Sequence, residues 1–338
     1  MTDLPLTKVA EDASTITLGW TPPAGAAGYT FWADGKRVSS TLDGTRSTAK
    51  FAKVASGLYA VNALGVVAVG SYPPIVPPPP PPPGESRLVL DFEPGNLSNF
   101  TGVESHDSSQ TAISTSKARQ GWGKYSCLVS DFPNSYWNGF LRCLITRYDS
   151  HETAGQEYWW AGSMWFPSSP NPIANNVLLF ELHHPSTLYN LNGLSVAPHA
   201  INYNAGNLEC RIATGNGIVG QGWTTWHPHN PLAAAPHDRW VDLIVNIRFS
   251  EGNDGYVKYY VDPTGSAAFD QAKPTFQMTG IPTLPFCNSA NVHNVQLYTE
   301  FGLYNNAGKN ATQANTDSYY TTGWRRETSW ADAVKAWG

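Results

Sequence analysis

The chain has 338 residues, of which 41% are hydrophobic, 12% aromatic and only 14% charged. This aromatic content excludes a globally disordered chain, and a formal net charge of −5 argues against a broad nucleic-acid-binding surface. The length predicts two domains, and the absence of any apolar run of about 18 residues predicts no membrane span.

Residues 1–72 have the pattern of a small β-sandwich. Short alternating segments such as Thr15–Gly19 are separated by turn residues, and Asp34-Gly35 is a strong two-residue hairpin signal. About six or seven such strands predict an immunoglobulin-like or fibronectin type III sandwich. Because this segment contains no His and no Cys, we expect a spacer or docking role for it.

A proline run separates the sandwich from the rest of the chain. Seven consecutive prolines, Pro77 to Pro83, lie in a linker predicted at 73–86. Prolines in series adopt polyproline II, because they can neither pair in a sheet nor continue an α-helix. At ~3.1 Å per residue, about eleven residues form a strut of roughly 34 Å that holds two domains apart. A ligand for a proline-binding domain is the alternative interpretation.

Residues 87–338 hold all nine His and 11 of the 13 Trp. Strand patterns recur here without intervening helices, and more than about ten strands predict a large two-sheet jelly roll. Ser329 to Asp332 predicts a capped start for a short helix that reaches Trp337. The predicted fold is therefore all-β, with a small sandwich joined by a polyproline linker to a large β-jelly roll.

Cysteine and histidine spacing gives no sign of a metal or another cofactor. The spacings of the four cysteines match no zinc template, and His227-Pro228-His229 has no third ligand nearby. No cofactor is expected, and nothing indicates a structural Ca²⁺. The start of the chain lacks a signal-peptide pattern, so we expect buried free thiols and a location inside a cell or in a released virion. The cysteines are Cys127, Cys143, Cys210 and Cys287.

Alternation along each strand of the second domain separates a core face from an outer face. In 177–183 it predicts a core face of Leu178, Phe180 and Leu182, and an outer face of Val177, Leu179, Glu181 and His183. A Glu and a His two residues apart on an apolar strand are costly to bury, so we expect them to line a groove.

Other strands leave polar and aromatic side chains outside the predicted core. One of Trp159 and Trp160 must belong to the core, and the other is either a platform for a sugar ring or a plug between strands. A sheet face rich in polar and aromatic groups is typical of a carbohydrate cleft. The candidate substrate-binding residues are Glu181, Asn246, Arg248, Gln296, Tyr298, Glu300 and Trp159.

Three segments of the first domain carry a resemblance to known modules: Thr15 to Gly25, Gly28-Tyr29 and Ala33 to Ser39. Together they resemble the fibronectin-like modules in minor tail proteins of actinobacterial phages. The resemblance implies a tail-tip protein in the virion, whose N-terminal module contacts other phage tail proteins. It leaves the oligomeric state open.

Five motifs occur in order in the second domain: Glu157 to Pro167, Leu178 to His183, Asp238 to Val245, Asp254 to Lys258 and Phe301 to Tyr304. Together they resemble the heparin lyase I-type polysaccharide lyases, which have a concanavalin-like jelly roll, across roughly 88–330.

The resemblance to these lyases implies β-elimination at a uronic acid. By this resemblance His183 is the catalytic base, and Tyr304 is the acid or shares the role of base. Arg142 is the candidate that holds the substrate carboxylate. Glu181 stands where the family commonly has an amide such as Gln.

Three functions follow from these patterns. The first is a phage tail-tip protein that binds and degrades a host cell-surface polysaccharide during adsorption. The second is a free extracellular polysaccharide lyase, and the third is a lectin-like protein that binds glycan without cleaving it. The acidic character of the domain favours a neutral or weakly acidic glycan over a strongly anionic one.

Overall fold

The structure is a computed structural model, and it describes most of the chain. The predicted linker at 73–86 lies outside the described residues, as does the Asp34-Gly35 hairpin signal. The described residues are 2–3, 6–24, 26–33, 36–41, 43–54, 59–64, 68–72, 87–174, 176–184, 197–218, 222–287, 292–293 and 295–338.

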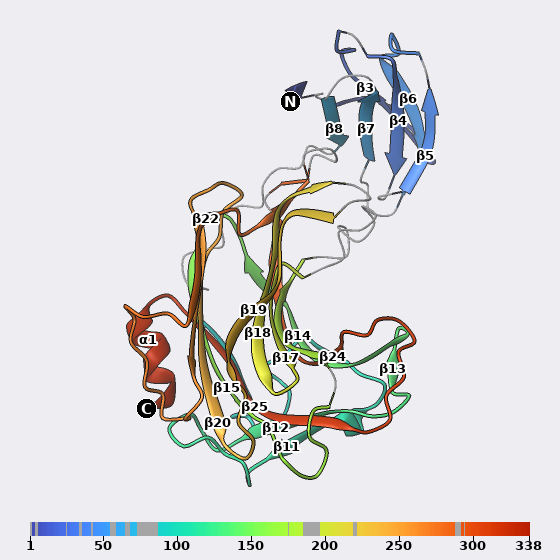
Figure 1. The fold of residues 1–338 in the computed structure, drawn as a ribbon. Helices are drawn as coiled ribbons and strands as arrows, with labels where there is room; N and C mark the ends of the chain where they lie inside the picture. The colour runs from blue at the N-terminus through green and yellow to red at the C-terminus, as the bar shows by residue number, and fades with distance from the viewer. Residues whose placement is uncertain are drawn as a thin grey trace.

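The N-terminal segment forms a sandwich of two sheets (Figure 1). One sheet has the order β1 (Thr2–Asp3), β8 (Ala68–Tyr72), β7 (Tyr59–Leu64), β4 (Gly28–Ala33) and β5 (Lys36–Thr41). The other has the order β2 (Thr7–Glu11), β3 (Thr15–Gly19) and β6 (Thr48–Ala52).

Aromatic rings fill the space between these two sheets. The ring of Trp20 lies 5.0 Å from that of Tyr29, and Phe31 lies 6.0 Å from Phe51. Alternation in β3 buries Ile16 and Leu18 in the same cluster. The segment is thus a two-sheet sandwich with its own core, and its kinship with fibronectin type III modules stays a prediction.

The C-terminal segment is a jelly roll of two large sheets (Figure 1). The nine-stranded sheet has the order β10 (Gly102–Glu104), β14 (Phe140–Glu152), β24 (Leu297–Asn305), β16 (Val177–His183), β17 (His199–Asn204), β18 (Asn207–Ile218) and β19 (Gly222–Ala234), with β13 (Tyr136–Trp137) paired to β14 and β23 (Pro285–Phe286) to β18. The eight-stranded sheet has the order β11 (Thr111–Ser114), β12 (Ser126–Asp131), β25 (Asp317–Glu327), β15 (Glu157–Trp165), β20 (Trp240–Arg248), β21 (Gly255–Asp262) and β22 (Phe276–Ile281), with β9 (Leu88–Asp91) paired to β25.

The core of the jelly roll lies between its two sheets. Cys143 and Ile145 of β14 and Trp160 of β15 belong to one buried cluster. Across the cluster, the rings of Phe180 in β16 and Trp324 in β25 lie 4.1 Å apart. The predicted all-β jelly roll is therefore confirmed. All four cysteines are buried free thiols, as the sequence predicts.

The outer face of the eight-stranded sheet is covered by the C-terminal helix, and we call it the helix face. Ser329 caps α1 (Trp330–Val334) by accepting a hydrogen bond from the backbone N–H of Asp332, as predicted. A 3₁₀ turn, Lys335–Trp337, follows; a second one, Ser108–Gln110, precedes β11. Trp330 packs 5.4 Å from Trp159, so apolar contacts hold the helix on the sheet.

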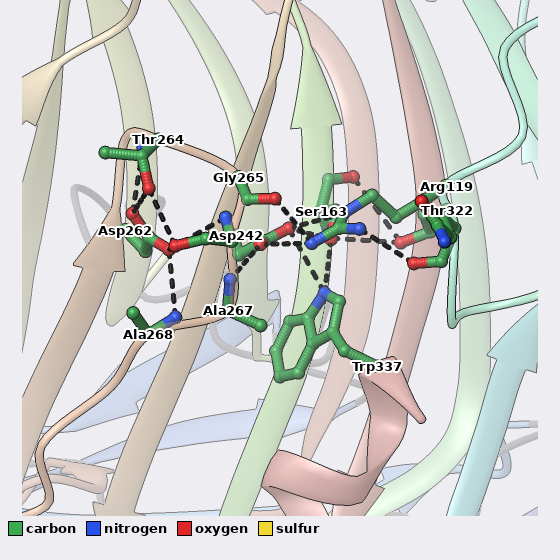
Figure 2. A network of polar contacts seen from close by, with 12 residues as sticks. Arg119, Ser163, Asp242, Asp262, Thr264, Gly265, Ala267, Ala268, Thr322 and Trp337 are labelled. Atoms are coloured by element: carbon green, nitrogen blue, oxygen red, sulfur yellow. Dashed lines mark hydrogen bonds and ion pairs between the residues drawn. The ribbon is translucent and has the colours of Figure 1, made fainter.

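A polar network also ties the helix end to the helix face (Figure 2). Asp242 accepts hydrogen bonds from the Nε and Nη2 atoms of Arg119 at 3.0 and 2.7 Å. The Ser163 hydroxyl and the Trp337 indole N–H also donate to Asp242, at 2.7 and 3.1 Å. None of the helices in the described part of the chain is long and apolar enough to cross a membrane.

Candidate active site

Polar side chains gather on the outer face of the nine-stranded sheet, which we call the site face. Strand register brings them into rows: Arg142 of β14 lies opposite Tyr304 of β24. In β16, Glu181 lies opposite Glu300 and His183 lies opposite Tyr298. The structure therefore brings together six residues that the sequence predicts as site residues, on three neighbouring strands.

A β-bulge in β16 decides which residues reach the site face. The register shifts between Leu178 and Phe180, and both Leu179 and Phe180 belong to the core between the sheets. Leu178 instead packs against Tyr304 in a small separate cluster. The predicted faces of Val177, Leu178 and Leu179 are therefore wrong, because the bulge interrupts the strict alternation.

The bulge leaves the second half of β16 with the predicted arrangement. Phe180 and Leu182 lie in the core, and Glu181 and His183 lie on the opposite face, beside Glu300 and Tyr298 of β24. His183 is 5% exposed. The sequence thus predicts the orientation of these two polar residues correctly.

His183 is held in one tautomer. Its Nδ1 atom lies 2.6 Å from the carbonyl oxygen of His184, and a carbonyl oxygen can only accept, so Nδ1 carries the hydrogen. The other nitrogen, Nε2, is then the basic one. Burial lowers the pKa of His183 to about 4, so the ring is neutral at neutral pH and able to accept a proton.

Glu181 and Glu300 form a buried carboxyl pair on neighbouring strands. They lie opposite each other in the pairing of β16 with β24, and burial raises the pKa of both. One ligand atom from each of Glu181, His183 and Glu300 lies within 4.8 Å of the others. Within the described residues, this is the one group of His, Cys, Asp and Glu side chains with spacing that suits a metal ion.

Arg142 lies at the centre of an aromatic and acidic cluster. Its guanidinium carbon is 4.3 Å from the centre of the Trp137 ring and 5.7 Å from that of Tyr304. Its Nη2 atom forms an ion pair with Glu104 at 2.8 Å. Because a guanidinium presents several donors, Arg142 is able to bind a second carboxylate while it holds Glu104.

Tyr304 supplies a protonated phenol beside this arginine. Burial raises the pKa of Tyr304, and the nearby Arg142 guanidinium acts in the opposite direction. The ring packs against Phe140 with centroids 5.6 Å apart. At neutral pH the hydroxyl is therefore a proton donor held in a fixed position.

Two charged residues of the site face are absent from the sequence-based list. Arg211 of β18 lies 4.0 Å from the Glu181 carboxylate, and Glu104 of β10 pairs with Arg142. Alternation contains the signal for Arg211, because its neighbours Cys210 and Ile212 are core residues. Glu104 lies on a strand of three residues, which is too short to show a pattern.

Tyr298 lies near the start of β24, and Gln296 lies just outside this strand. The Tyr298 ring is 5.3 Å from that of His183 and 5.1 Å from that of Tyr148. Gln296 comes directly before the first residue of the strand and is partly buried. Tyr298 therefore belongs to the site cluster, whereas Gln296 lies just before the strand that carries Tyr298.

The remaining predicted site residues lie on the other sheet. Trp159 packs under the C-terminal helix against Trp330 and Tyr260. The Asn246 amide donates to Glu157 and to the carbonyl of Tyr158 at 3.2 and 3.1 Å.

Arg248 ends β20, in the same sheet as Trp159 and Asn246. Its Nη2 atom lies 3.5 Å from the Asp254 carboxylate. These three residues are therefore not brought together with His183, and Trp159 is buried beneath the C-terminal helix. Alternation gives the face of a strand but does not say to which sheet the strand belongs.

Comparisons with known proteins agree with this arrangement of the jelly roll. A family model described as polysaccharide lyase matches residues 92–325. No curated protein sequence matches the chain.

Several solved structures of lyases are similar to this chain. An endo-β-1,4-glucuronan lyase from the fungus Trichoderma reesei is 15% identical, covering 70% of this chain and 94% of that chain, with a TM-score of 0.53. A PL-14 alginate lyase from Aplysia kurodai is 12% identical, covering 72% and 97%, with a TM-score of 0.46. An alginate lyase from Chlorella virus is 11% identical, covering 72% and 99%, with a TM-score of 0.44. At 15% identity, the likeness to the glucuronan lyase shows the fold alone.

Proposed function

We propose that this chain, which belongs to the polysaccharide lyase family, cleaves a uronic-acid polysaccharide by β-elimination on its site face. The observation that carries the proposal is the neutral, oriented imidazole of His183 on the same sheet face as Tyr304 and Arg142. A base, an acid and a cation for a carboxylate are the groups that this reaction needs.

The proposed reaction balances with these groups alone. Arg142 binds the substrate carboxylate and stabilises the charge that develops when the C5 proton leaves. His183 Nε2 takes that proton, and the electron pair of the C5–H bond forms the C4–C5 double bond. The C4–O bond breaks, and the Tyr304 hydroxyl gives its proton to the departing oxygen.

The proposal is tested by incubating the full chain with glucuronan, alginate and other uronans, and recording the ultraviolet absorbance of the unsaturated ends. His183→Ala should lower the rate by about 10²–10⁴-fold, the usual contribution of a positioned base. Binding of these polysaccharides without any unsaturated product would overturn the elimination and leave a lectin-like role.

His199 provides a matched control for His183. It is also buried, burial also lowers its pKa to about 4, and its Nε2 lies 2.7 Å from the carbonyl oxygen of Thr283. Its ring packs 6.4 Å from the core residue Phe249, beneath the site face. His199→Ala should therefore leave the rate per folded molecule unchanged. An equal loss in both variants would mean that His183 acts only through folding.

We further propose that the lyase acts at the tip of a phage tail on a host cell-surface polysaccharide. The sequence resemblance of residues 1–72 to tail-protein modules and the proline run after them support this location. A stiff linker would carry the lyase domain away from the particle. Mass spectrometry of purified phage particles should detect the chain; its presence only in culture supernatant would favour a free extracellular lyase.

A further inference from the structure

One aromatic side chain beside the candidate active site is exposed. Tyr148 of β14 is 44% exposed, whereas His183 is 5% exposed. Among the large hydrophobic side chains that the described part of the chain exposes, Tyr148 is the only aromatic one; the others are Val9, Val38 and Val89. The Tyr148 ring is therefore available to a ligand next to the site, since the core does not use it.

The Tyr148 ring is fixed by its neighbours. Its centroid lies 5.1 Å from that of Tyr298, and its hydroxyl donates a hydrogen bond to Glu104 at 2.9 Å. A Cβ atom at Gly102 of β10 would lie 3.3 Å from the ring carbon Cε2, so the glycine leaves room for the ring. Because the ring is already held in place, little conformational entropy is lost when a ligand binds to it.

Three rings form a line that leads from the surface to the proposed base. The Tyr148 and Tyr298 centroids are 5.1 Å apart, and the Tyr298 and His183 centroids are 5.3 Å apart. Each step is close to the length of one sugar unit in a polysaccharide. A chain whose reacting uronate lies at His183 would therefore bring its second unit from that uronate to Tyr148.

Glu104 connects Tyr148 to the arginine that the proposed reaction uses. The Oε1 atom of Glu104 accepts the bond from Tyr148, and its Oε2 atom pairs with Arg142 at 2.8 Å. One carboxylate thus fixes both the exposed ring and the guanidinium that would bind the uronate. The spacing between these two contacts sets the position of a polysaccharide along the sheet.

We propose that Tyr148 is a sugar-binding platform, on which the second unit from the reacting uronate stacks. The apolar C–H face of a sugar ring packs on an aromatic ring, and an exposed, fixed tyrosine suits this contact. The assignment rests on the proposed lyase function and deepens it. The preferred substrate is then a chain long enough to reach from His183 to Tyr148, and a disaccharide should bind poorly.

The first test is Tyr148→Ala with glucuronan as substrate. Loss of the stacked ring should raise KM about tenfold. The platform binds the ground state and the transition state alike, so kcat should stay within about twofold. Tyr148→Phe keeps the ring and should restore most of the lost affinity. An unchanged KM in a folded Tyr148→Ala chain would overturn the platform.

Tyr320→Ala is the matched control. Tyr320 of β25 is also a partly exposed tyrosine, but its neighbour Tyr319 is a core residue, so Tyr320 lies on the helix face. Its removal should leave KM for glucuronan unchanged. An equal rise of KM in both variants would mean that Tyr148 acts through the general state of the fold, which would also overturn the platform.

A binding measurement separates this inference from the proposed function. Titration calorimetry in a Tyr304→Phe background, which limits cleavage, compares a glucuronan hexasaccharide with the disaccharide. Adding Tyr148→Ala should weaken hexasaccharide binding about tenfold and leave disaccharide binding almost unchanged.

The outcomes of these measurements are distinct. If the native chain cleaves no uronan but the hexasaccharide loses affinity with Tyr148→Ala, the lyase function fails and the platform stands. If uronans are cleaved and the hexasaccharide binds Tyr148→Ala as tightly as its parent, the platform is overturned while the lyase function stands. A native chain that does not bind the hexasaccharide would also overturn the platform.

Discussion

The two outer faces of the jelly roll both bury charged side chains, but the buried carboxylates differ in the partners that surround them. On the helix face, both oxygens of Asp242 are fully engaged by Arg119 and neighbouring donors, including the backbone N–H of Ala267 at 2.9 Å (Figure 2). On the site face, Glu181 lies opposite Glu300 with an oxygen of each within 4.8 Å, and the Arg211 guanidinium is 4.0 Å from the Glu181 carboxylate.

This difference distinguishes polar contacts that stabilise the fold from polar groups that are suited to catalysis. A buried ion pair whose hydrogen-bonding capacity is filled holds elements in place, as Asp242 holds the end of the chain through Trp337. A buried cluster with shifted pKa values, as at His183 and the carboxyl pair, is typical of a functional site. The two faces should therefore respond differently to substitution.

The largest effect is expected for Tyr304→Phe on the site face. The variant keeps the ring that packs on Phe140 and removes only the hydroxyl, so kcat should fall by about 10²–10⁴-fold with little change in stability. Steady-state kinetics and a thermal melt check both expectations.

Tyr319→Phe is the matched control for Tyr304→Phe. This buried phenol donates to the carbonyl of Leu179 at 3.3 Å, within the core. Its loss should cost about 1 kcal/mol of stability and leave kcat unchanged. Equal kcat values for native chain and Tyr304→Phe would remove Tyr304 from the reaction.

A smaller effect, on stability alone, is expected for Asp242→Ala on the helix face. Arg119 would remain buried without its partner, so the free energy of unfolding should fall by about 3–5 kcal/mol. Chemical denaturation measures this loss, and kcat per folded molecule should not change.

Replacing both partners tests the reason for that loss. Arg119→Met combined with Asp242→Leu leaves no unpaired charge and should be more stable than Asp242→Ala. A fall in kcat with Asp242→Ala as large as that with Tyr304→Phe would break the distinction between the two faces.

Alternation in the sequence predicts the core of the jelly roll well. In β20, Val241, Leu243, Val245 and Ile247 occupy alternate positions, and all four lie in the core. It also places His183 and Glu181 on the correct face, although the bulge reverses their neighbours at 177–179.

What alternation could not predict is the pairing of distant strands. Alternation places Trp159 and Asn246 outside the core, as it does the site residues, but their strands belong to the other sheet. The last residues of the chain then cover Trp159 through Trp330, a contact between positions far apart in sequence. Arg211 shows the opposite case, because its alternation signal was present and only its proximity to Glu181 required the fold.

The smallest expected effect is on the pH dependence of stability, which should differ between the buried His199 in the core and the carboxyl pair on the site face. Burial lowers the pKa of His199 from 6.5 to about 4, so the folded chain binds fewer protons than the unfolded chain between these values, and stability falls as pH falls through this range. His199→Gln removes this contribution: as pH is lowered from 6.5 toward 4, the variant should lose less stability than the native chain, by up to about 1.4 kcal/mol per pH unit.

The double variant Glu181→Gln/Glu300→Gln should show a pH dependence of the opposite sign. Carboxyls with a raised pKa stabilise the fold at low pH and lose that contribution as pH rises. Denaturant titrations across this pH range measure both slopes, and slopes of the same sign in the two variants would contradict the assigned protonation states.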